Sequence, residues 1–327
     1  MKAIRYHEKG GPEVLRLEEV PMPEPGSHEV LIKVEAAGVN YADTMRRWGD
    51  YYPIPTPLPH IPGGELVGTV TATGAGVDTR KIGQRVFAWP VSGAYAQFVA
   101  SPVERTAPCP AGLAPTAAVA ILIQGLTAAL LLREAAHLQR GETVFVEAAA
   151  GGVGLLAVQL AKLYGAGKVI AGASTGEKRE LAQSVGADAA VDYTTPGWSK
   201  QVLALNGGRG VDVILEMTGG KVFEEALHCL GPLGRTVVYG VASREPYSVP
   251  TPPLIGAGHG VIGFALPLYL QRPGLVGDTL RELAEWVRSD KLKVKIGAAF
   301  PLVEAADAHR MLEGRKSVGK LVMLPWE

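Results

Sequence analysis

A glycine-containing turn near the middle of the chain is the first feature with clear chemical meaning. Residues 149–154 read A-A-G-G-V-G and lie between the apolar run T-V-F-V-E-A and a helix-like segment, L-L-A-V-Q-L-A-K-L-Y-G. Gly151 lets backbone approach a pyrophosphate, and Gly154 lets a helix pack closely on the preceding strand. Because amide donors at a helix start attract anions, this context predicts a dinucleotide-binding turn. The alternative is a tight strand–helix turn without a ligand.

Ala149 stands where such turns usually have their first glycine. A methyl group fits at this position if the backbone keeps a negative φ angle. The substitution therefore does not exclude a dinucleotide, and it predicts that the turn avoids the left-handed region at Ala149.

The tip of the next predicted strand indicates which dinucleotide is bound. An NAD site has Asp or Glu about 20 residues beyond the glycines, where it binds the ribose diol. The segment A-G-A-S-T-G-E-K-R-E instead offers Ser174, Thr175 and Lys178, and Glu177 is expected to face water. Hydroxyls and a cation suit a 2′-phosphate, which Tyr193 is expected to cover. The combination favours NADPH over NADH, although Lys178 alone is also typical of a solvated helix face.

The composition is typical of a soluble globular protein, with 327 residues, 47% hydrophobic and 20% charged. The length suits two domains. The formal net charge is zero, so no large field attracts nucleic acid or anionic lipid. Two cysteines, and a start without an apolar stretch, predict a cytoplasmic protein without a signal peptide. The apolar run 117–132 is interpreted as a buried helix, because it is short for a membrane span and is interrupted by Gln124, Gly125 and Thr127.

The type of predicted element changes along the chain. The first third contains short β-branched runs separated by Gly and Pro, which predict strands. From about residue 117, strand-like and helix-like segments alternate, as they do in a parallel sheet. The tail adds predicted helices at 277–290 and 304–312 and a strand at 319–324.

At this point the sequence resembles a known family. The segments A-A-G-V-N-Y-A-D-T-M-R-R-W-G-D-Y, P-H-I-P-G-G-E-L-V-G-T-V, A-A-A-G-G-V-G-L-L-A-V-Q-L and L-G-P-L-G-R-T-V-V-Y-G resemble the zinc-free, zeta-crystallin-like quinone oxidoreductases of the medium-chain dehydrogenase/reductase superfamily. The resemblance runs nearly from end to end. It implies an α/β fold in which a GroES-like β domain accompanies a Rossmann domain with a doubly wound parallel sheet. The implied ranges are 1–119 for the GroES-like catalytic domain, 120–266 for the Rossmann NADPH-binding domain and 267–327 for a return to the catalytic domain.

The resemblance also indicates that no metal is bound. Zinc enzymes of the superfamily have Cys and His where this chain has Asn40 and Gly64, and their third ligand falls near Gln124. None of these three supplies the thiolate or imidazole that zinc prefers. Without a Lewis acid, the substrate should be an acceptor already activated by conjugation, such as a quinone or an enone.

The family's functional positions map onto named residues of this chain. Asn40 and Tyr51 are the catalytic candidates, because they match positions beside the nicotinamide and the substrate. The implied cofactor contacts are Asn40, Thr127, Gly151, Gly152, Val153, Gly154, Ser174, Lys178, Tyr193, Tyr239, Gly240, Val241, Phe264 and Arg315. Met217 stands where relatives usually have a serine, so that cofactor contact is not carried over. Met45 replaces a tyrosine common near the substrate, so the acceptor pocket is expected to be less polar.

Two acidic residues near Asn40 have an alternative interpretation. Asp43 and Glu65 could be read as paired catalytic acids. We interpret Asp43 instead as ordering the Asn40 segment, and Glu65 as a local hydrogen-bonding group.

The resemblance implies a NADPH-dependent quinone oxidoreductase that transfers a hydride, or electrons, without zinc. One alternative is a NADPH-dependent enone or enoyl reductase, which needs the same cofactor and differs in its acceptor. An alternative of another class is a NADPH-binding structural or RNA-associated protein with little turnover. The isoelectric point near 7.1 and the lack of a basic stripe disfavour RNA binding.

The last predicted strand of the Rossmann sheet indicates assembly. Residues 260–266, G-V-I-G-F-A-L, have neither a charge nor a proline to protect a sheet edge from pairing. Relatives pair this edge across a two-fold axis, which implies a homodimer. The alternative is an edge covered by the following segment, P-L-Y-L-Q-R-P-G.

Overall fold

The structure, a computed structural model, describes residues 1–50, 54–245 and 247–327. It divides into two compact units, of which unit 1 comprises Met1–Ile123 with Leu280–Glu327 and unit 2 comprises Gln124–Thr279. Both divisions fall inside helical segments, Pro115–Ala135 and α10 (Pro273–Arg288), rather than in loops. The limits of the two units therefore differ from the domain ranges that the resemblance implies. Those ranges, 1–119, 120–266 and 267–327, remain a prediction.

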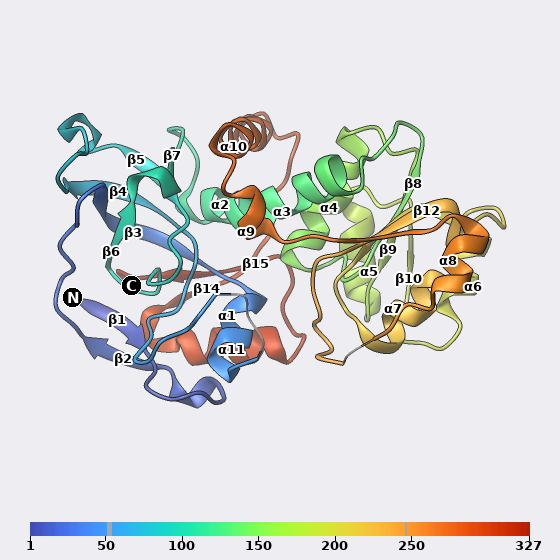
Figure 1. Cartoon of the computed structure of the whole chain (residues 1–327), viewed down its shortest axis with the longest axis horizontal. Helices are drawn as coiled ribbons and strands as arrows, with labels where there is room; N and C mark the ends of the chain where they lie inside the picture. The colour runs from blue at the N-terminus through green and yellow to red at the C-terminus, as the bar shows by residue number, and fades with distance from the viewer. Residues whose placement is uncertain (51–53, 246) are drawn as a thin grey trace. The chain divides into compact units, whose positions relative to one another are not determined.

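Unit 2 is built on six parallel strands in the order β10-β9-β8-β11-β12-β13 (Figure 1). The strands are β8 (Thr143–Val146), β9 (Lys168–Gly172), β10 (Ala189–Val191), β11 (Val211–Glu216), β12 (Leu230–Val238) and β13 (Gly260–Gly263). The chain winds outward from β8 in one direction and then from β11 in the other. This is the doubly wound order, and it places a topological switch between β8 and β11, where ligands usually bind. The predicted fold class is confirmed.

Helices alternate with these strands along the chain, as right-handed crossovers require. They are α3 (Leu126–Leu130), α4 (Gly152–Leu163), α5 (Gly176–Ser184), α6 (Trp198–Leu205), α7 (Gly220–Leu227), α8 (Thr251–Ala257) and α9 (Leu266–Tyr269). All four residues of β8 are buried, as expected for a central strand covered on both faces. Phe145 stacks on Trp198 with ring centroids 5.0 Å apart.

Unit 1 is a mainly antiparallel β structure. Its larger sheet has the order β14-β15-β3-β4-β5-β7, with β6 also paired to β3, while β1 and β2 form a separate pair. The strands are β1 (Lys2–Arg5), β2 (Arg16–Glu19), β3 (Glu29–Val39), β4 (Leu66–Thr73), β5 (Arg85–Ala88), β6 (Phe98–Pro102), β7 (Thr106–Pro108), β14 (Ile296–Pro301) and β15 (Lys320–Leu324). The helices are α1 (Tyr41–Trp48), α2 (Pro115–Ala120) and α11 (Ala305–Glu313), besides the α10 residues assigned to this unit. The core includes Ile32, Leu66, Tyr95 and Leu321.

Two local features have limits that differ from the predicted ones, although the first is the buried helix that the sequence predicted. The apolar helical segment Pro115–Ala135 is 21 residues long, so its length alone is compatible with a membrane span. However, 72% of its most apolar stretch is buried within the protein, which is typical of a core helix. The edge strand β13 ends at Gly263, so only the first four residues of the predicted 260–266 strand pair with β12.

Candidate functional site

The A-A-G-G-V-G segment forms a strand–turn–helix junction between β8 and α4. Gly151 precedes the helix as its N-cap with a φ of −74°, and no side chain caps the helix start. The amides of the first helical turn have no acceptor within the helix, so they are available to an anion. Gly151 to Val153 are only half-buried, whereas Gly154 is buried. The geometry expected of a pyrophosphate site is therefore present in unit 2.

The backbone explains why each small residue stands in this turn. The residue with positive φ is Ala148, at +45°, and Ala149 is not among the residues with positive φ, so the prediction for its backbone is confirmed. A Cβ on Gly154 would overlap the carbonyl oxygen of Ala148, and a Cβ on Gly152 would overlap the side chain of Gln124. Gly154 is therefore required by packing against backbone, whereas at Gly152 the contact is with the end of a flexible side chain, which can move. At Gly151, among the residues that the structure describes, the one atom within 4 Å of an added Cβ is the Ala148 carbonyl oxygen, at 3.2 Å, which is a tight contact but less severe than those at Gly152 and Gly154.

The tip of β9 gathers polar and cationic groups. Thr175 caps α5 by accepting a hydrogen bond from the Lys178 amide at 3.3 Å. Ser174 and Lys178 are half-buried, while Glu177 is exposed, as the sequence predicted. Tyr193 follows β10, and a Cβ on Gly172 would lie 2.9 Å from its ring. Because β9 and β10 are parallel neighbours, these groups share the carboxyl edge of the sheet.

Arg179 is a cation at this edge that sequence reasoning missed. Its Nη1 lies 2.9 Å from Asp192 Oδ2 and donates to the Ala173 carbonyl at 3.2 Å. This pair links the start of α5 to the residue that precedes Tyr193. In the sequence, the signal for Arg179 was its position next to Lys178. That Arg179 lies beside Asp192 follows from the pairing of β9 with β10.

Loop 239–241 and Phe264 lie at the same edge, after β12 and β13. The Tyr239 amide donates to the Glu216 carbonyl at 3.0 Å, and burial raises the pKa of the Tyr239 hydroxyl. Gly240 lies against Met217, since an added Cβ would be 3.0 Å from its carbonyl oxygen. Phe264 is buried and stacks on Tyr269, with ring centroids 4.9 Å apart.

Two fully buried glutamates were not anticipated from the sequence. Glu147 follows β8 and Glu216 ends β11, and these strands are neighbours. Glu147 Oε2 accepts from the amides of Met217 and Thr218 at 3.4 and 3.3 Å, and Glu216 Oε1 accepts from Gly219 at 2.5 Å. Burial and the neighbouring Glu216 raise the pKa of Glu147 to about 8. Burial also raises the pKa of Glu216. The pair therefore carries a proton at neutral pH.

This pair predicts a distinct dependence of stability on pH. In an unfolded chain Glu147 titrates near 4.5, whereas in the folded chain its pKa is about 8. Between these values the folded state holds a proton that the unfolded state has lost. The free energy of unfolding should therefore fall as pH rises from about 4.5 to about 8, and level off above. Glu147→Gln should flatten this fall, as measured by urea unfolding across that pH range.

Glu142 provides a matched control on the same sheet. Its carboxylate lies 2.6 Å from Arg235, and hydrogen bonding to Arg235 and Gln139 lowers its pKa despite burial. A carboxyl group with a lowered pKa stabilises the fold at pH values above its unfolded pKa, so Glu142→Gln should lower the free energy of unfolding at neutral pH. The decrease of this free energy between pH 4.5 and 8, which is due to Glu147, should remain. An unchanged fall in Glu147→Gln would show that the glutamate pair does not share a proton.

Asn40 lies in a second polar cluster, inside unit 1. Its backbone amide donates to Asp43 Oδ2 at 2.9 Å, which fixes the start of α1. Its side-chain Nδ2 donates to Glu65 Oε1 at 2.6 Å. Burial raises the pKa of Asp43 to about 6, although the Asn40 amide opposes the shift. The expected role of Asp43 in ordering the Asn40 segment is confirmed, whereas Glu65 bonds to residues distant in the sequence rather than locally.

The remaining candidate residues are distributed between the units. Thr127 is buried in α3 of unit 2. Arg315 is exposed after α11 of unit 1, with a φ of +55°. Tyr51 lies outside the described residues. Within the described part of the chain, no group of three or more His, Cys, Asp or Glu side chains could hold a metal ion.

The chain resembles known proteins along its whole length. Residues 26–112 match the alcohol dehydrogenase GroES-like domain, and residues 152–285 match the zinc-binding dehydrogenase domain. A quinone oxidoreductase of Pseudomonas aeruginosa is 36% identical over 99% of both chains. A 2-haloacrylate reductase of a Burkholderia species is 34% identical over 99% of this chain and 98% of its own. The structure of Escherichia coli quinone oxidoreductase complexed with NADPH superposes with a TM-score of 0.93, at 32% identity, over 99% of this chain and 100% of that one.

Proposed function

The chain belongs to the zinc-free quinone oxidoreductase branch of the medium-chain dehydrogenase/reductase family, and from this membership we propose that it is an enzyme that reduces a quinone with NADPH. The observation that carries the proposal is the full-length similarity to quinone oxidoreductases, including one whose structure contains NADPH. The carboxyl edge of the unit 2 sheet supports it, because its turn and strand tip suit NADPH.

The residues of unit 2 fit the parts of NADPH by their chemistry. The half-buried Gly151, which has no side chain, and the first-turn amides of α4 suit the pyrophosphate. Ser174 and Lys178, with Tyr193 beside them, suit the 2′-phosphate, and no acid competes at the β9 tip. We assign the remaining cofactor contacts to Asn40, Thr127, Gly152, Val153, Gly154, Tyr239, Gly240, Val241, Phe264 and Arg315.

When bound, NADPH supplies a hydride, and the protein's part is to orient the reactants and exclude water. Asn40 and Tyr51 are the proposed groups nearest the acceptor. A quinone that accepts a hydride develops negative charge on oxygen, which a fixed N–H donor such as the Asn40 amide stabilises. Protonation of the product then comes from water or a polar group.

Steady-state oxidation of NADPH with a panel of quinones and a panel of enones tests the proposal. Turnover with quinones supports it. Turnover restricted to enones would favour the second candidate, an enone or enoyl reductase, which the similarity to 2-haloacrylate reductase makes the main rival. Tight NADPH binding without turnover on either panel would instead indicate a binding protein of another class.

We expect the purified enzyme to keep full activity after exhaustive chelation. Asn40, Gly64 and Gln124 stand at the three ligand positions of the zinc enzymes, and none of these side chains is a thiolate or an imidazole. Activity before and after dialysis against a chelator provides the measurement. One tightly bound zinc per chain, found by elemental analysis, would contradict this expectation.

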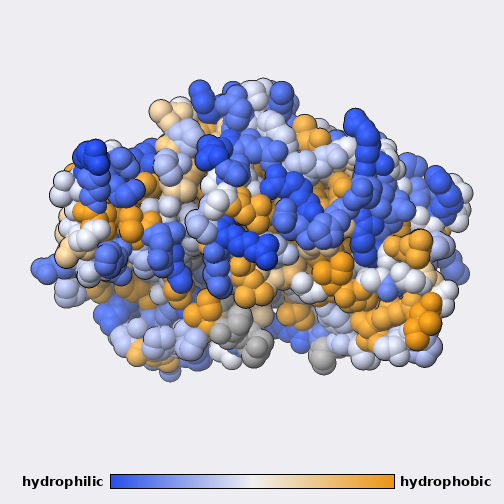
Figure 2. Space-filling view, turned by 45° about the horizontal axis from the view of Figure 1, so that its top comes forward, coloured by the Kyte–Doolittle hydropathy of each residue, from blue (hydrophilic) through white to orange (hydrophobic). Residues whose placement is uncertain are grey.

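We also propose a cytoplasmic homodimer that pairs through β13. This strand is the edge of the unit 2 sheet, and Leu233, Ile255 and Leu268 are 79%, 83% and 65% exposed in the same unit. Figure 2 shows apolar residues gathered on the surface of unit 2. Two free, buried cysteines, Cys109 and Cys229, suit a reducing compartment.

Ile262→Lys should weaken this dimer and leave NADPH binding unchanged. Ile262 lies at the centre of β13 opposite Val237, so a lysine there adds the kind of charge that blocks edge pairing. Light scattering at micromolar concentration measures the assembly. A monomeric unmodified protein would rule the dimer out.

A further inference from the structure

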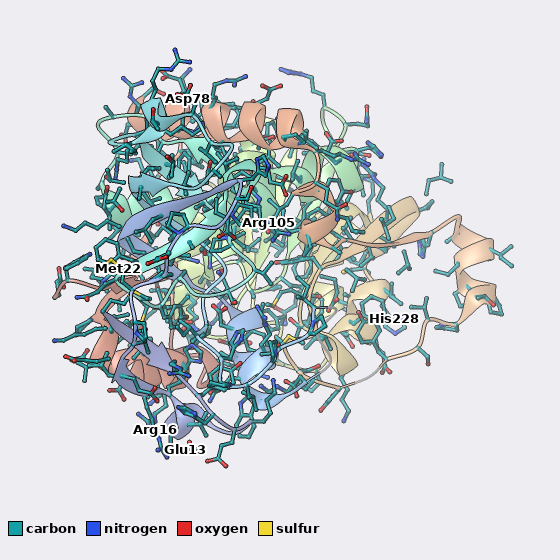
Figure 3. All side chains as sticks on the ribbon, turned by 60° about the vertical axis from the view of Figure 1, so that its left-hand side comes forward. Glu13, Arg16, Met22, Asp78, Arg105 and His228 are labelled. Carbon is teal, nitrogen blue, oxygen red and sulfur yellow. The ribbon has the colours of Figure 1, made fainter. Side chains whose placement is uncertain are left out.

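A fully buried ion pair connects Asn40 to the last strand of unit 1. Lys320, the first residue of β15, is 1% exposed, and Glu65, next to the start of β4, is 0% exposed. Lys320 Nζ lies 2.5 Å from Glu65 Oε1. Charged residues of this unit normally face water, as Glu13, Arg16 and Asp78 do at its surface (Figure 3). Because burying two charges is costly, a buried pair calls for a specific explanation.

The pair holds the Asn40 amide in one orientation. Lys320 Nζ donates to Asn40 Oδ1 at 3.0 Å and to the Val39 carbonyl at 3.2 Å. Asn40 Nδ2 donates to Glu65 Oε1 at 2.6 Å, and Glu65 Oε2 accepts from the Ile123 amide at 2.7 Å. An ammonium only donates and a carboxylate only accepts, so the amide oxygen must face Lys320 and its nitrogen must face Glu65.

We propose that Glu65 and Lys320 are positioning residues, which set the orientation of the Asn40 amide for hydride transfer to the acceptor. Asn40 is only half-buried, and these contacts use one of its two Nδ2 hydrogens. The second hydrogen remains as a donor of fixed direction. The inference rests on the proposed function, because that function makes Asn40 the donor to the acceptor oxygen. In this role a preorganised amide does part of the work that a Lewis acid does in zinc enzymes.

The double variant Glu65→Gln with Lys320→Met tests this directly. The Ile123 amide requires an acceptor, so the new side-chain amide should turn its oxygen to Ile123 and its NH₂ to Asn40. With the ammonium gone, the Asn40 oxygen should turn toward that NH₂ and the orientation should reverse. We expect kcat for the quinone to fall about ten- to a hundredfold, as displaced catalytic groups typically cause. The dissociation constant for NADPH should change less than kcat does, because neither Glu65 nor Lys320 is itself a proposed cofactor contact.

A control variant separates positioning from general stability. Arg47 and Glu313 form another ion pair in unit 1, with Nη2 2.5 Å from Oε1 and Arg47 fully buried. Arg47→Met with Glu313→Gln should alter the thermal stability and leave kcat unchanged. Unchanged kcat in a folded Glu65→Gln, Lys320→Met protein would overturn the proposal.

A double-mutant cycle of Glu65→Gln and Asn40→Ala tests the proposal even if the Glu65→Gln, Lys320→Met protein does not fold. Glu65→Gln alone and Asn40→Ala alone should each lower kcat, but Glu65→Gln should cause no further loss in an Asn40→Ala background. Independent, multiplicative losses would mean that Glu65 acts other than through Asn40 and would overturn the proposal.

A readout without turnover separates this inference from the proposed function. The Asn40 Nδ2 hydrogen that bonds to Glu65, assigned by its absence in Asn40→Ala, should show slow hydrogen exchange in the unmodified protein and faster exchange in Glu65→Gln. If the protein does not reduce quinones but exchange at the Asn40 amide is slow, the proposed function is wrong. The inference that Glu65 and Lys320 fix the Asn40 amide is then still supported. Fast exchange in the unmodified protein would refute the fixed amide whatever the activity.

Discussion

Replacing Gly151 by valine is expected to abolish NADPH binding while the chain still folds. An added Cβ meets the Ala148 carbonyl oxygen at 3.2 Å, which must shift by a few tenths of an ångström, and the φ of −74° suits any residue. A pyrophosphate held by the first-turn amides of α4 needs the same space as the valine side chain. Fluorescence titration with NADPH measures binding, and circular dichroism with thermal unfolding verifies the fold.

The choice of glycine decides whether this experiment is informative. A Cβ on Gly154 would lie 2.6 Å from the Ala149 Cα and would overlap the Ala148 carbonyl, so its replacement would damage the fold itself. Ala149→Gly is the matched control, because Ala149 has no positive φ and its side chain is buried. Its NADPH affinity should stay nearly unchanged. Full NADPH binding by a folded Gly151→Val protein would overturn the assignment of this turn.

Features that depend on neighbours in the sequence were predictable. The turn follows a buried strand and opens a helix because glycine spacing and apolar periodicity act over a few residues. The exposed Glu177 and the Thr175 cap follow from the same local rules. The doubly wound order was expected because strands and helices alternate after residue 117.

Features that depend on strand order were not predictable from the residues alone. Glu147 and Glu216 are 69 residues apart in number, and they meet because β8 and β11 are neighbours at the switch point of the sheet. Lys320 reaches Glu65 only because β15 pairs with β3 beside β4. Glu147, Glu216 and Lys320 look like ordinary surface charges in the sequence, and Glu65 was expected to bond only locally, so tertiary pairing alone reveals these buried pairs.

Helix and strand limits were also set by tertiary context. Helix α8 contains Pro252 and Pro253 yet forms, because both prolines lie in its first turn, where no intrahelical amide is required. The helical segment Pro115–Ala135 is longer than the apolar run 117–132, and the 72% burial of its most apolar stretch agrees with the buried helix expected from the sequence.

Lys178→Ala is expected to raise the Michaelis constant for NADPH far more than that for NADH. Lys178 is half-buried in the first turn of α5, beside Ser174 at the tip of β9. Removing one charge-assisted contact to the 2′-phosphate should cost about 1.5–3 kcal/mol, or roughly ten- to a hundredfold in the Michaelis constant. NADH has no 2′-phosphate, so its constant should barely change. Initial rates with each cofactor at saturating quinone give both values.

Two comparisons locate the effect at the 2′-phosphate. Lys162→Ala removes a lysine of similar exposure whose Nζ is 2.5 Å from Asp188, at the amino edge of the sheet, and should leave both constants unchanged. High salt should reduce the difference in the Michaelis constant for NADPH between the unmodified protein and Lys178→Ala, because screening weakens a partly exposed charge contact. Equal changes for NADPH and NADH in Lys178→Ala would place the 2′-phosphate elsewhere. In that case Arg179, which is held by Asp192 at the same edge, becomes the cation to replace next.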